Sequence, residues 1–473
     1  MAYSTYRIAA LRGVDQSHGF YGERGTSPDA LNMICRGGAM TTARAPAMLK
    51  PKPPEDCERL FQGFFRSENG ADSTYILAAG GGRVYALKNG AWQCLGEGFQ
   101  SDDWCAVNYR HEDDDWLILV NGRDKMRYWD GQSDSLMPVD VTIGGEDVLF
   151  ERLTLIYERL WGAVTATEPD RVYWSEEFAP DDWELNTDIP DTGGGFMDVA
   201  TFDGSRIRAI VAAFDEVLIF KDRSMHRLNG TYPGDFSLTQ VYGSEGTLAA
   251  RTIVHTASRL FFLGSDGLCV YDGMTAASIA HLGDRRMEGV FARVNQRAIA
   301  KACAALWRDV IYLALPLDGA TENTHVVRYS ISDGTWALLG ISGVRDWLVR
   351  REGQKEELLY LSKQGLFRVD EGKGALPGAH WTTPALPAST LSRRRLGRVA
   401  FSIEAQAAGS VILTAASDQG RVSRTVTFPA GHSMIRQRLR LRGRWLRLVI
   451  EAGSDAIFTL PDGLEMQIEE EAP

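Results

Sequence analysis

The stretch Tyr75-Ile-Leu-Ala-Ala-Gly-Gly-Gly-Arg-Val-Tyr85 consists of an apolar run, a glycine turn and a second run, and Asn89-Gly90 and Trp92 follow it. Short apolar runs separated by such turns are typical of β-hairpins. A similar unit, ending in an aromatic residue with Asp-Gly or a related dipeptide, recurs about seven times between Cys57 and Gly372. Its spacing of roughly 30–55 residues is the period of four-stranded propeller blades. The pattern predicts an all-β fold with a β-propeller of about seven blades, and two stacked sandwiches are the alternative.

The composition agrees with a β-rich chain. The 473 residues include 48 Gly, 12 Trp, 15 Tyr and 19 Phe, which favours turns and strands. Apolar residues have helix-like spacing at 284–296. We expect no membrane span, because no apolar run reaches about 18 residues, and no signal peptide is visible. The six cysteines form no Cys-x-x-Cys pair and are expected to be reduced, buried residues.

The chain divides into four predicted parts. Residues 1–55 are polar and rich in turns, and they are expected to form an extended N-terminal strap or linker. Residues 56–372 contain the repeated unit and form the predicted propeller. Residues 373–391 are a Pro-rich linker. Residues 392–473 contain several further apolar runs that suit a small β-sandwich.

The net charge of -11 is unevenly distributed. Residues 392–447 contain twelve Arg, no Lys and two acids, which is a net charge of +10. Residues 448–473 contain seven acids and no basic residue, so their charge is -7, and residues 1–391 carry the remaining -14. A basic segment therefore lies inside an acidic protein.

Four arginines of the basic segment occur at every second position. Arg436, Arg438, Arg440 and Arg442 would share one face of a strand, with Leu439 and Leu441 on the other. Such a row can contact DNA phosphates or an acidic protein surface, and a solvated outer face of the sandwich is an equally good interpretation. Sequence-specific DNA recognition is not expected, because no groove-entering element is evident. The candidate partner or DNA contacts are Arg393, Arg394, Arg395, Arg436, Arg438, Arg440, Arg442 and Arg444.

Sequence motifs for catalysis or cofactor binding are missing. The chain has no HExxH, GxSxG or GxxxxGK[ST] motif, and its eight histidines are scattered singly. We therefore expect no enzyme activity, no cofactor and no metal site. The acidic run Glu112-Asp113-Asp114-Asp115 is expected to be a solvated hairpin tip, with a cation site as the less favoured interpretation.

Several segments together resemble a family of phage virion proteins. Ser27-Pro-Asp-Ala-Leu-Asn-Met33 with Gly37-Gly38-Ala39 is similar to the opening strap of these proteins. The series from Arg159-Leu-Trp-Gly through Pro169-Asp-Arg-Val-Tyr-Trp-Ser175 to Pro180-Asp-Asp-Trp183 resembles their internal signature. Val217 to Leu228 and Gly243 to Thr247 resemble the segments that follow. The chain departs from the pattern at Met48-Leu-Lys-Pro51, where the family commonly has Arg-Pro-Gly.

The family comprises the tail-hub, or packaged-DNA stabilisation, proteins of short-tailed phages and the related tail-nozzle proteins. The resemblance implies a β-propeller protein of the virion tail that is made in the host cytoplasm and assembles as a ring, a homohexamer, below the portal and its adaptor. It implies partners among tail proteins, retention of packaged double-stranded DNA with non-specific contact to it, and a part in the ejection conduit. The alternative is a glycan-binding or glycan-hydrolysing propeller at the host surface. That alternative would use carboxylates at one mouth and Trp104, Trp116, Trp129, Trp161, Trp174 and Trp183 for stacking, although core packing explains these residues more simply.

Overall fold

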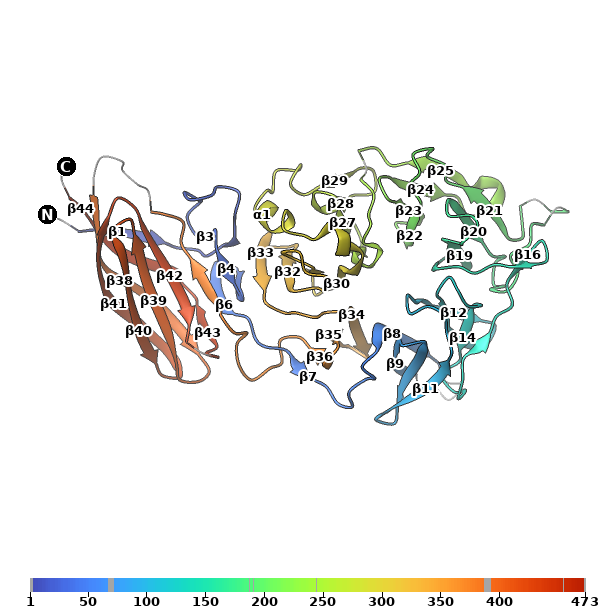
Figure 1. The fold of residues 1–473 in the computed structure, drawn as a ribbon, viewed down its shortest axis with the longest axis horizontal. Helices are drawn as coiled ribbons and strands as arrows, with labels where there is room; N and C mark the ends of the chain where they lie inside the picture. The colour runs from blue at the N-terminus through green and yellow to red at the C-terminus, as the bar shows by residue number, and fades with distance from the viewer. Residues whose placement is uncertain are drawn as a thin grey trace.

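The computed structural model describes residues 3–66, 72–186, 188–189, 191–243, 245–386, 393–453 and 455–471. Regular structure in these residues is almost entirely β, as Figure 1 shows, so the predicted all-β class is confirmed. The segment predicted to be helical contains one short helix, α1 (Glu288–Phe291), followed by the 3-10 helix η3 (Gln296–Lys301). Residues 387–391 of the expected linker, and residue 392, lie outside the described residues.

From Cys57 onward the chain builds seven small sheets one after another. The first sheet contains β8 (Cys57–Phe65), β9 (Ser73–Gly80), β10 (Arg83–Lys88) and β11 (Ala91–Glu97). The second contains β12 (Cys105–His111), β13 (Asp114–Val120), β14 (Arg127–Trp129) and β15 (Met137–Pro138), and the hairpin β16 (Thr142–Ile143) and β17 (Glu146–Asp147) follows it. The third contains β18 (Arg152–Ile156), β19 (Arg159–Ala163), β20 (Arg171–Trp174) and β21 (Gly195–Asp198).

The remaining four sheets continue this pattern. The fourth contains β22 (Ile207–Ala213), β23 (Glu216–Lys221), β24 (Met225–Asn229) and β25 (Ser237–Gln240), with the 3-10 helix η1 (Pro233–Asp235) before β25. The fifth follows the 3-10 helix η2 (Ala250–Thr252) and contains β26 (Val254–His255), β27 (Leu260–Gly264), β28 (Gly267–Tyr271) and β29 (Ala276–Ser278). The sixth contains β30 (Cys303–Trp307), β31 (Val310–Leu315), β32 (His325–Ser330) and β33 (Thr335–Leu339). The seventh contains β34 (Asp346–Glu352), β35 (Lys355–Ser362) and β36 (Gly365–Arg368).

Figure 1 shows these sheets following one another around a central region. The first strand of each sheet packs beside its neighbours: β8 contacts β12 and β34, β18 contacts β12 and β22, and β30 contacts β26 and β34. The fourth and fifth sheets share an apolar cluster in which the rings of Phe220 and Phe262 lie 5.1 Å apart. Each sheet is therefore packed against the next, and the seventh is packed against the first.

Side chains bridge the gaps between neighbouring first strands. The Gln62 amide on β8 donates to the carbonyl oxygen of Arg351 on β34 (2.6 Å) and accepts from the Arg351 N–H (2.9 Å). Asn108 on β12 makes the same kind of two-way contact with β8, donating to the Gln62 carbonyl oxygen and accepting from the Phe64 N–H. Asp346 at the start of β34 accepts from Arg59 and from the Leu60 N–H, at 3.0 and 2.9 Å.

The C-terminal region consists of two further sheets at the opposite end of the molecule (Figure 1). The β38 sheet contains β38 (Arg393–Ala405), β41 (Gly431–Gly443), β43 (Phe458–Leu460) and β44 (Leu464–Glu471). The β42 sheet contains β37 (His380–Thr382), β39 (Gly409–Ser417), β40 (Gly420–Phe428) and β42 (Leu446–Ala452). Residues of both sheets, such as Val399 and Leu413, are buried in one apolar cluster.

The N-terminal segment expected to be a strap supplies seven short strands to other parts of the fold. It joins the β38 sheet with β1 (Tyr3–Ile8), β5 (Met33–Arg36) and β6 (Ala39–Thr42), and the β42 sheet with β4 (Ala30–Leu31). It extends the sixth sheet with β2 (Gly13–Val14) and β3 (Thr26–Ser27), and completes the seventh with β7 (Ala47–Met48). The expected linker supplies β37 to the β42 sheet.

A continuous apolar core joins the two ends of the molecule. It runs from Leu313 and Trp336 of the sixth sheet, past Met33 of the N-terminal segment, to Trp381 and Val399 of the C-terminal sheets. All five side chains are at most 2% exposed. Burial of this size couples the two regions mechanically, because separating them would expose large aromatic and aliphatic surfaces to water.

We expect Asp346→Ala to lower the free energy of unfolding by about 3 kcal/mol, because the substitution leaves the buried Arg59 guanidinium with one fewer carboxylate and the Leu60 N–H without its acceptor. Glu356→Ala on the adjacent strand is the matched control. It removes an exposed ion pair with Arg351 and should change the value by less than about 0.5 kcal/mol. Urea denaturation of both variants is the measurement, and equal losses would show that Asp346 does not hold the first and seventh sheets together.

Candidate functional site

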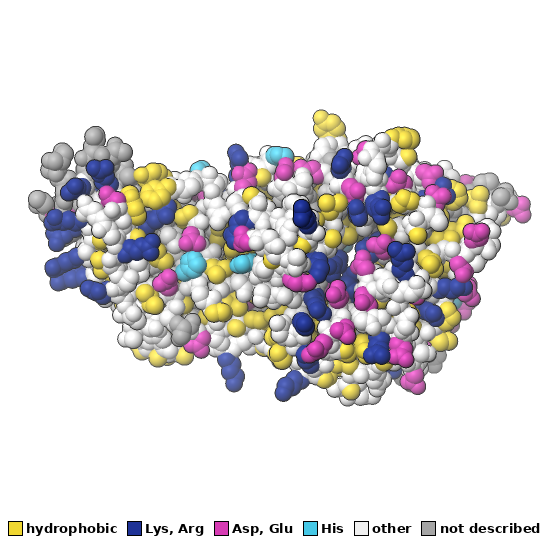
Figure 2. Space-filling model, viewed as in Figure 1, with side chains coloured by type: hydrophobic (Ala, Val, Ile, Leu, Met, Phe, Trp, Pro, Cys, Tyr) yellow, Lys and Arg dark blue, Asp and Glu magenta, His cyan; other side chains and the backbone are white. Residues whose placement is uncertain are grey.

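The arginine row of β41 lies on the outside of the β38 sheet. Arg436, Arg438, Arg440 and Arg442 are exposed, whereas Leu439 and Leu441 between them are buried. This alternation is the one predicted from the period of two. Consecutive arginines are about 6.7 Å apart along a strand, so the row spans about 20 Å. Figure 2 shows a group of Lys and Arg side chains at the end of the molecule where β41 lies.

The upstream arginines lie on β38, between β41 and the acidic strand β44. Arg395 is opposite Arg442 on one side and opposite Glu469 on the other, and its guanidinium lies 3.9 Å from the Glu469 carboxylate. Arg398 is opposite Arg438 and Gln467. The basic and acidic segments of the sequence are therefore neighbours in one sheet, and β44 offsets part of the charge of β38.

The arginines of β41 are farther from this acidic strand. β41 is an edge strand, since it pairs with β38 alone among the described strands. In the described part of the chain, the guanidinium groups of Arg436, Arg438 and Arg440 have no ion pair and no hydrogen bond. Charges on a sheet edge oppose edge-to-edge aggregation, and unpaired guanidinium groups also suit a polyanionic partner. Arg444, past the end of the strand, is exposed, and its N–H donates to Asp418 at 2.7 Å.

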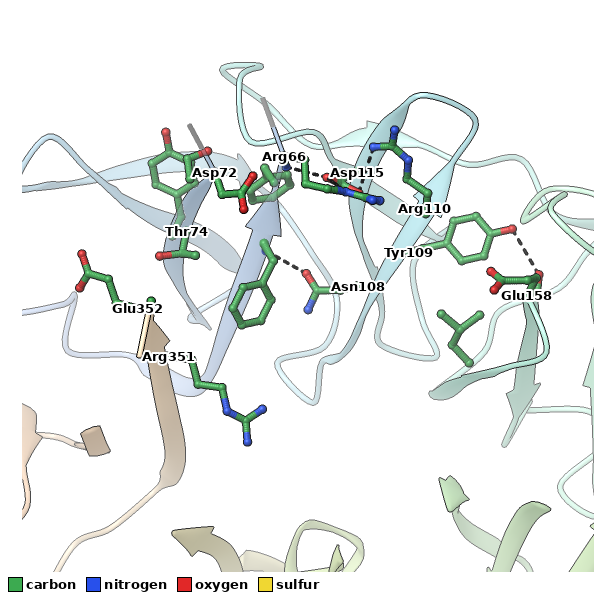
Figure 3. Close-up of a pocket in the computed structure, with 16 residues that line it drawn as sticks. Arg66, Asp72, Thr74, Asn108, Tyr109, Arg110, Asp115, Glu158, Arg351 and Glu352 are labelled. Atoms are coloured by element: carbon green, nitrogen blue, oxygen red, sulfur yellow. Dashed lines mark hydrogen bonds and ion pairs between the residues drawn. The ribbon is translucent and has the colours of Figure 1, made fainter. Parts of the chain in front are cut away.

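A cavity of about 1040 Å³ lies at the other region of interest, where the first strands β8, β12 and β34 end (Figure 3). Arg66, Arg110 and Asp115 lie along one side of it, and Arg351 and Glu352 come from the seventh sheet. Phe64, which is 40% exposed, and Tyr75 add aromatic surface. The sequence did not indicate this cavity, because its lining comes from four sheets that are far apart in the chain.

Asp115 contacts two of the arginines that line this cavity. Its carboxylate accepts from the Arg66 guanidinium (2.8 Å), from the Arg66 N–H (2.6 Å) and from Arg110 (3.2 Å). These hydrogen bonds, with Arg66 the most important, lower the pKa of Asp115 to about 2. The prediction of a solvated tip fits Glu112, Asp113 and Asp114, which are exposed. It is wrong for Asp115, because β13 has already begun and directs this side chain toward Arg66.

The tryptophans proposed for sugar stacking are mainly core residues. Five are at most 5% exposed: Trp104, Trp129, Trp161, Trp174 and Trp183. Trp116 is half-buried and stacks on Tyr128, with ring centroids 3.8 Å apart. None of the six lines the cavity in Figure 3. This burial agrees with the simpler interpretation, core packing.

The segments that carry the family resemblance meet at one buried lysine. Lys221, which is fully buried, donates to the Val199 carbonyl oxygen at 2.6 Å and pairs with Asp170 at 3.2 Å. The Lys221 carbonyl oxygen accepts from the Thr247 N–H, and a Cβ on Gly246 would lie 2.1 Å from that oxygen. Three of the quoted segments are thus joined where the third, fourth and fifth sheets meet.

The internal signature also has a buried structural role in the third sheet. Arg159 is 2% exposed and donates to the carbonyl oxygens of Ser175 and Gly193, at 2.7 and 3.0 Å. The Trp183 indole N–H donates to the Pro180 carbonyl oxygen at 2.8 Å. These residues therefore fix the backbone of the third sheet instead of facing a cavity.

The described residues contain no group of three His, Cys, Asp or Glu side chains that could hold a metal ion. No disulfide joins the six cysteines, of which Cys35, Cys57, Cys269 and Cys303 are buried, Cys105 is half-buried and Cys94 is exposed. Burial raises the pKa of the Cys35, Cys57 and Cys303 thiols to about 12. None of the described helices is long and apolar enough to cross a membrane.

Comparisons with known proteins place no family name on the chain. No family model matches it, and no curated protein matches its sequence. Among solved structures it is similar to the extracellular domain of the hybrid two component system BT4673 from B. thetaiotaomicron, with 7% identity and a TM-score of 0.46. A second structure of a BT4673 extracellular domain gives 8% identity and a TM-score of 0.44. Each match covers 89% of this chain but only 62% of the length of the matched structure.

We expect the Asp115 carboxyl to stay ionised at pH 3. Its folded pKa of about 2 is below its ordinary value of 3.8, so its contribution to stability is complete above pH 3.8 and is lost as the pH falls through about 2. Arg66→Ala should raise the pKa of Asp115 toward 3.8. Carboxyl-carbon NMR titration of aspartate-labelled protein is the measurement. Arg350→Ala, which removes a cation paired with Glu352, is the control that should leave the Asp115 titration in place.

Proposed function

We propose that this chain is a structural component of a phage tail: a hub, nozzle or portal-proximal plug. In this proposal several copies, a hexamer, form a ring below the portal and its adaptor, retain packaged DNA and form part of the ejection conduit. The seven sheets are then the blades of a β-propeller, and the β38 and β42 sheets are a β-sandwich attached to it. The protein has no catalytic role in this proposal and is incorporated into the virion after synthesis in the host cytoplasm.

The junction around Lys221 is the observation that supports the proposal best. The segments that resemble the tail proteins hold Lys221 at the junction of successive sheets, and they place Arg159 and Trp183 where they fix the backbone of the third sheet. A resemblance at residues that join or stabilise the sheets indicates a similar architecture. It supports a shared scaffold and a mechanical role, whereas a shared catalytic activity would place the common residues around a cavity.

The way in which the two regions are held together also suits a component that is under mechanical force. The continuous core from Trp336 to Trp381 and the N-terminal strands tie the seven sheets to the C-terminal sheets. A component that retains packaged DNA has to resist displacement. Two regions joined by a large buried apolar surface resist it better than regions joined by a flexible linker.

The charge distribution assigns two roles of such a component, a conduit for DNA and a contact surface, to different parts of the molecule. The body, residues 1–391, has a net charge of -14 and repels DNA, which suits a conduit through which DNA must slide. The exposed arginines of β41 are the surface for a partner subunit, a tail protein or the DNA end. Among the eight arginines predicted as partner or DNA contacts, those of β41 are therefore the stronger candidates. The charge of Arg395 on β38 is partly neutralised by Glu469.

A glycan-binding or glycan-hydrolysing propeller is the second candidate. The cavity in Figure 3 favours it, because about 1040 Å³ with aromatic and amide side chains has room for a small saccharide. Hydrolysis would need a carboxylic acid of raised pKa in the cavity. The pKa of Asp115 is lowered instead, because hydrogen bonds from two arginines favour its ionised form. Binding without cleavage is thus the stronger form of this alternative.

Native mass spectrometry of the purified chain, alone and mixed with its candidate tail adaptor, tests the proposal. A closed ring of several copies in either sample is the expected result. A monomer in both samples, together with saturable binding of host-surface oligosaccharides, would replace the tail role with the glycan alternative.

We expect Arg438→Glu with Arg440→Glu to weaken ring assembly or DNA retention at least about tenfold, because two unpaired cations of the β41 row become anions. The free energy of unfolding should change by less than about 0.5 kcal/mol for these exposed positions. Assembly is measured by native mass spectrometry and DNA retention by a nuclease-protection assay on particles.

Arg421→Glu with Arg424→Glu is the matched control for this row. These arginines are also exposed and lie on β40, an edge strand of the β42 sheet, so the net charge change is identical. Assembly and retention should be close to normal in this variant. Equal defects in both variants would mean that net charge matters and that the β41 row is not a specific contact.

A further inference from the structure

A second, smaller cavity contains an unusual concentration of arginines. It has a volume of about 210 Å³ and lies where the first strands β18 and β22 begin, at the opposite end of β18 from the cavity in Figure 3. Its lining includes Arg152, Arg206, Arg208 and Arg251, but only two acids, Asp103 and Glu151. Three successive sheets contribute these arginines, so the cluster exists only in the folded protein.

The acids in and around this cavity are already paired. Arg152 contacts Asp103 at 2.7 Å and Glu151 at 2.9 Å. Asp103 also pairs with Arg59 at 2.8 Å. Arg208 pairs with Asp222, which lies in the turn between β23 and β24. Each of these carboxylates is thus already paired with Arg152, Arg59 or Arg208.

Two guanidinium groups of this lining form no ion pair among the described residues, although Arg251 interacts at longer range with Asp103 and Arg206 with Glu151. Arg251 is fixed by backbone carbonyl oxygens, those of Arg345 at 3.0 Å and of Ala300 and Lys301 at 3.4 Å. Arg206 is exposed at the mouth and has no hydrogen bond or ion pair within the described part of the chain. One cation is therefore held in place by the backbone, and the other is available at the entrance.

The backbone at this cavity is strained. Val164, which lines it, has a φ of 63°, in the left-handed region that β-branched residues avoid. Such conformations persist where the surrounding structure imposes them, and they cluster at ligand sites. Here the Val164 carbonyl oxygen accepts from the Glu151 N–H at 3.3 Å, next to the Arg152 ion pairs.

We infer that this cavity binds a phosphate group, with Arg206 and Arg251 as its principal ligands. The lining carries two more positive than negative charges, which a phosphate of charge between -1 and -2 offsets. Guanidinium groups bind phosphate through paired N–H donors. A volume of 210 Å³ corresponds to about seven liquid waters, which is room for one phosphate and its hydration but not for a polymer. The phosphate is either the free ion or the terminal group of a larger molecule, and the inference does not depend on the tail role.

Isothermal titration calorimetry at constant ionic strength, balanced with sodium chloride, tests the site. Sodium phosphate is one titrant, and a short oligonucleotide with or without a 5′-phosphate is the other. We expect saturable binding of free phosphate or of the 5′-phosphorylated oligonucleotide alone, and about tenfold weaker binding in Arg206→Ala. The first result assigns the free ion and the second a phosphate terminus.

Arg206→Ala should fold normally because the side chain is exposed and unpaired, and its melting temperature without phosphate verifies this. Arg421→Ala on the distant strand β40 is the control and should bind like the unmodified protein. Absence of binding to either titrant overturns the inference. Binding that Arg206→Ala leaves unchanged, or that the oligonucleotide without a 5′-phosphate reproduces, overturns it as well.

Discussion

The first strands of neighbouring sheets do not share a backbone hydrogen-bonded ladder, because each strand belongs to a separate sheet. The rest of the structure depends on how the gap between these strands is bridged. Side chains replace the ladder. Gln62 and Asn108 satisfy backbone donors and acceptors on the adjacent strand, and Asp346 brings Arg59 and Leu60 together. An unpaired polar group at such a position would be costly, so these positions require amides or carboxylates of the right length.

Local features of the fold could be predicted from the sequence. The glycine turn after Ala79 does connect two paired strands, and the alternation around Leu439 does place arginines on one face. Both follow from interactions within a few residues, which a sequence pattern records directly. The helix expected at 284–296 is mostly turns, because Met287 and Val290 are buried against the sixth-sheet region by tertiary packing and not by a helical stripe.

Long-range contacts could not be predicted in this way. The polar, turn-rich character of the N-terminal segment predicts an extended strap or linker, but nothing in it identifies β44 or β36 as strand partners more than 300 residues away. The ionised state of Asp115 depends on Arg66 of another sheet, and the charge near Arg395 depends on Glu469. For the same reason neither cavity was evident, since each is lined by residues that only the folded chain brings together.

The pairing of β1 with β44 has a consequence for how the protein is made. Ser4 and Ile468 are joined by a hydrogen bond across 464 positions of the chain, so β1 leaves the ribosome long before its partner exists. Contacts of this separation form late and slow the completion of folding. The β38 sheet is therefore complete only after β44 has been synthesised, and the surface that carries the arginine row matures late.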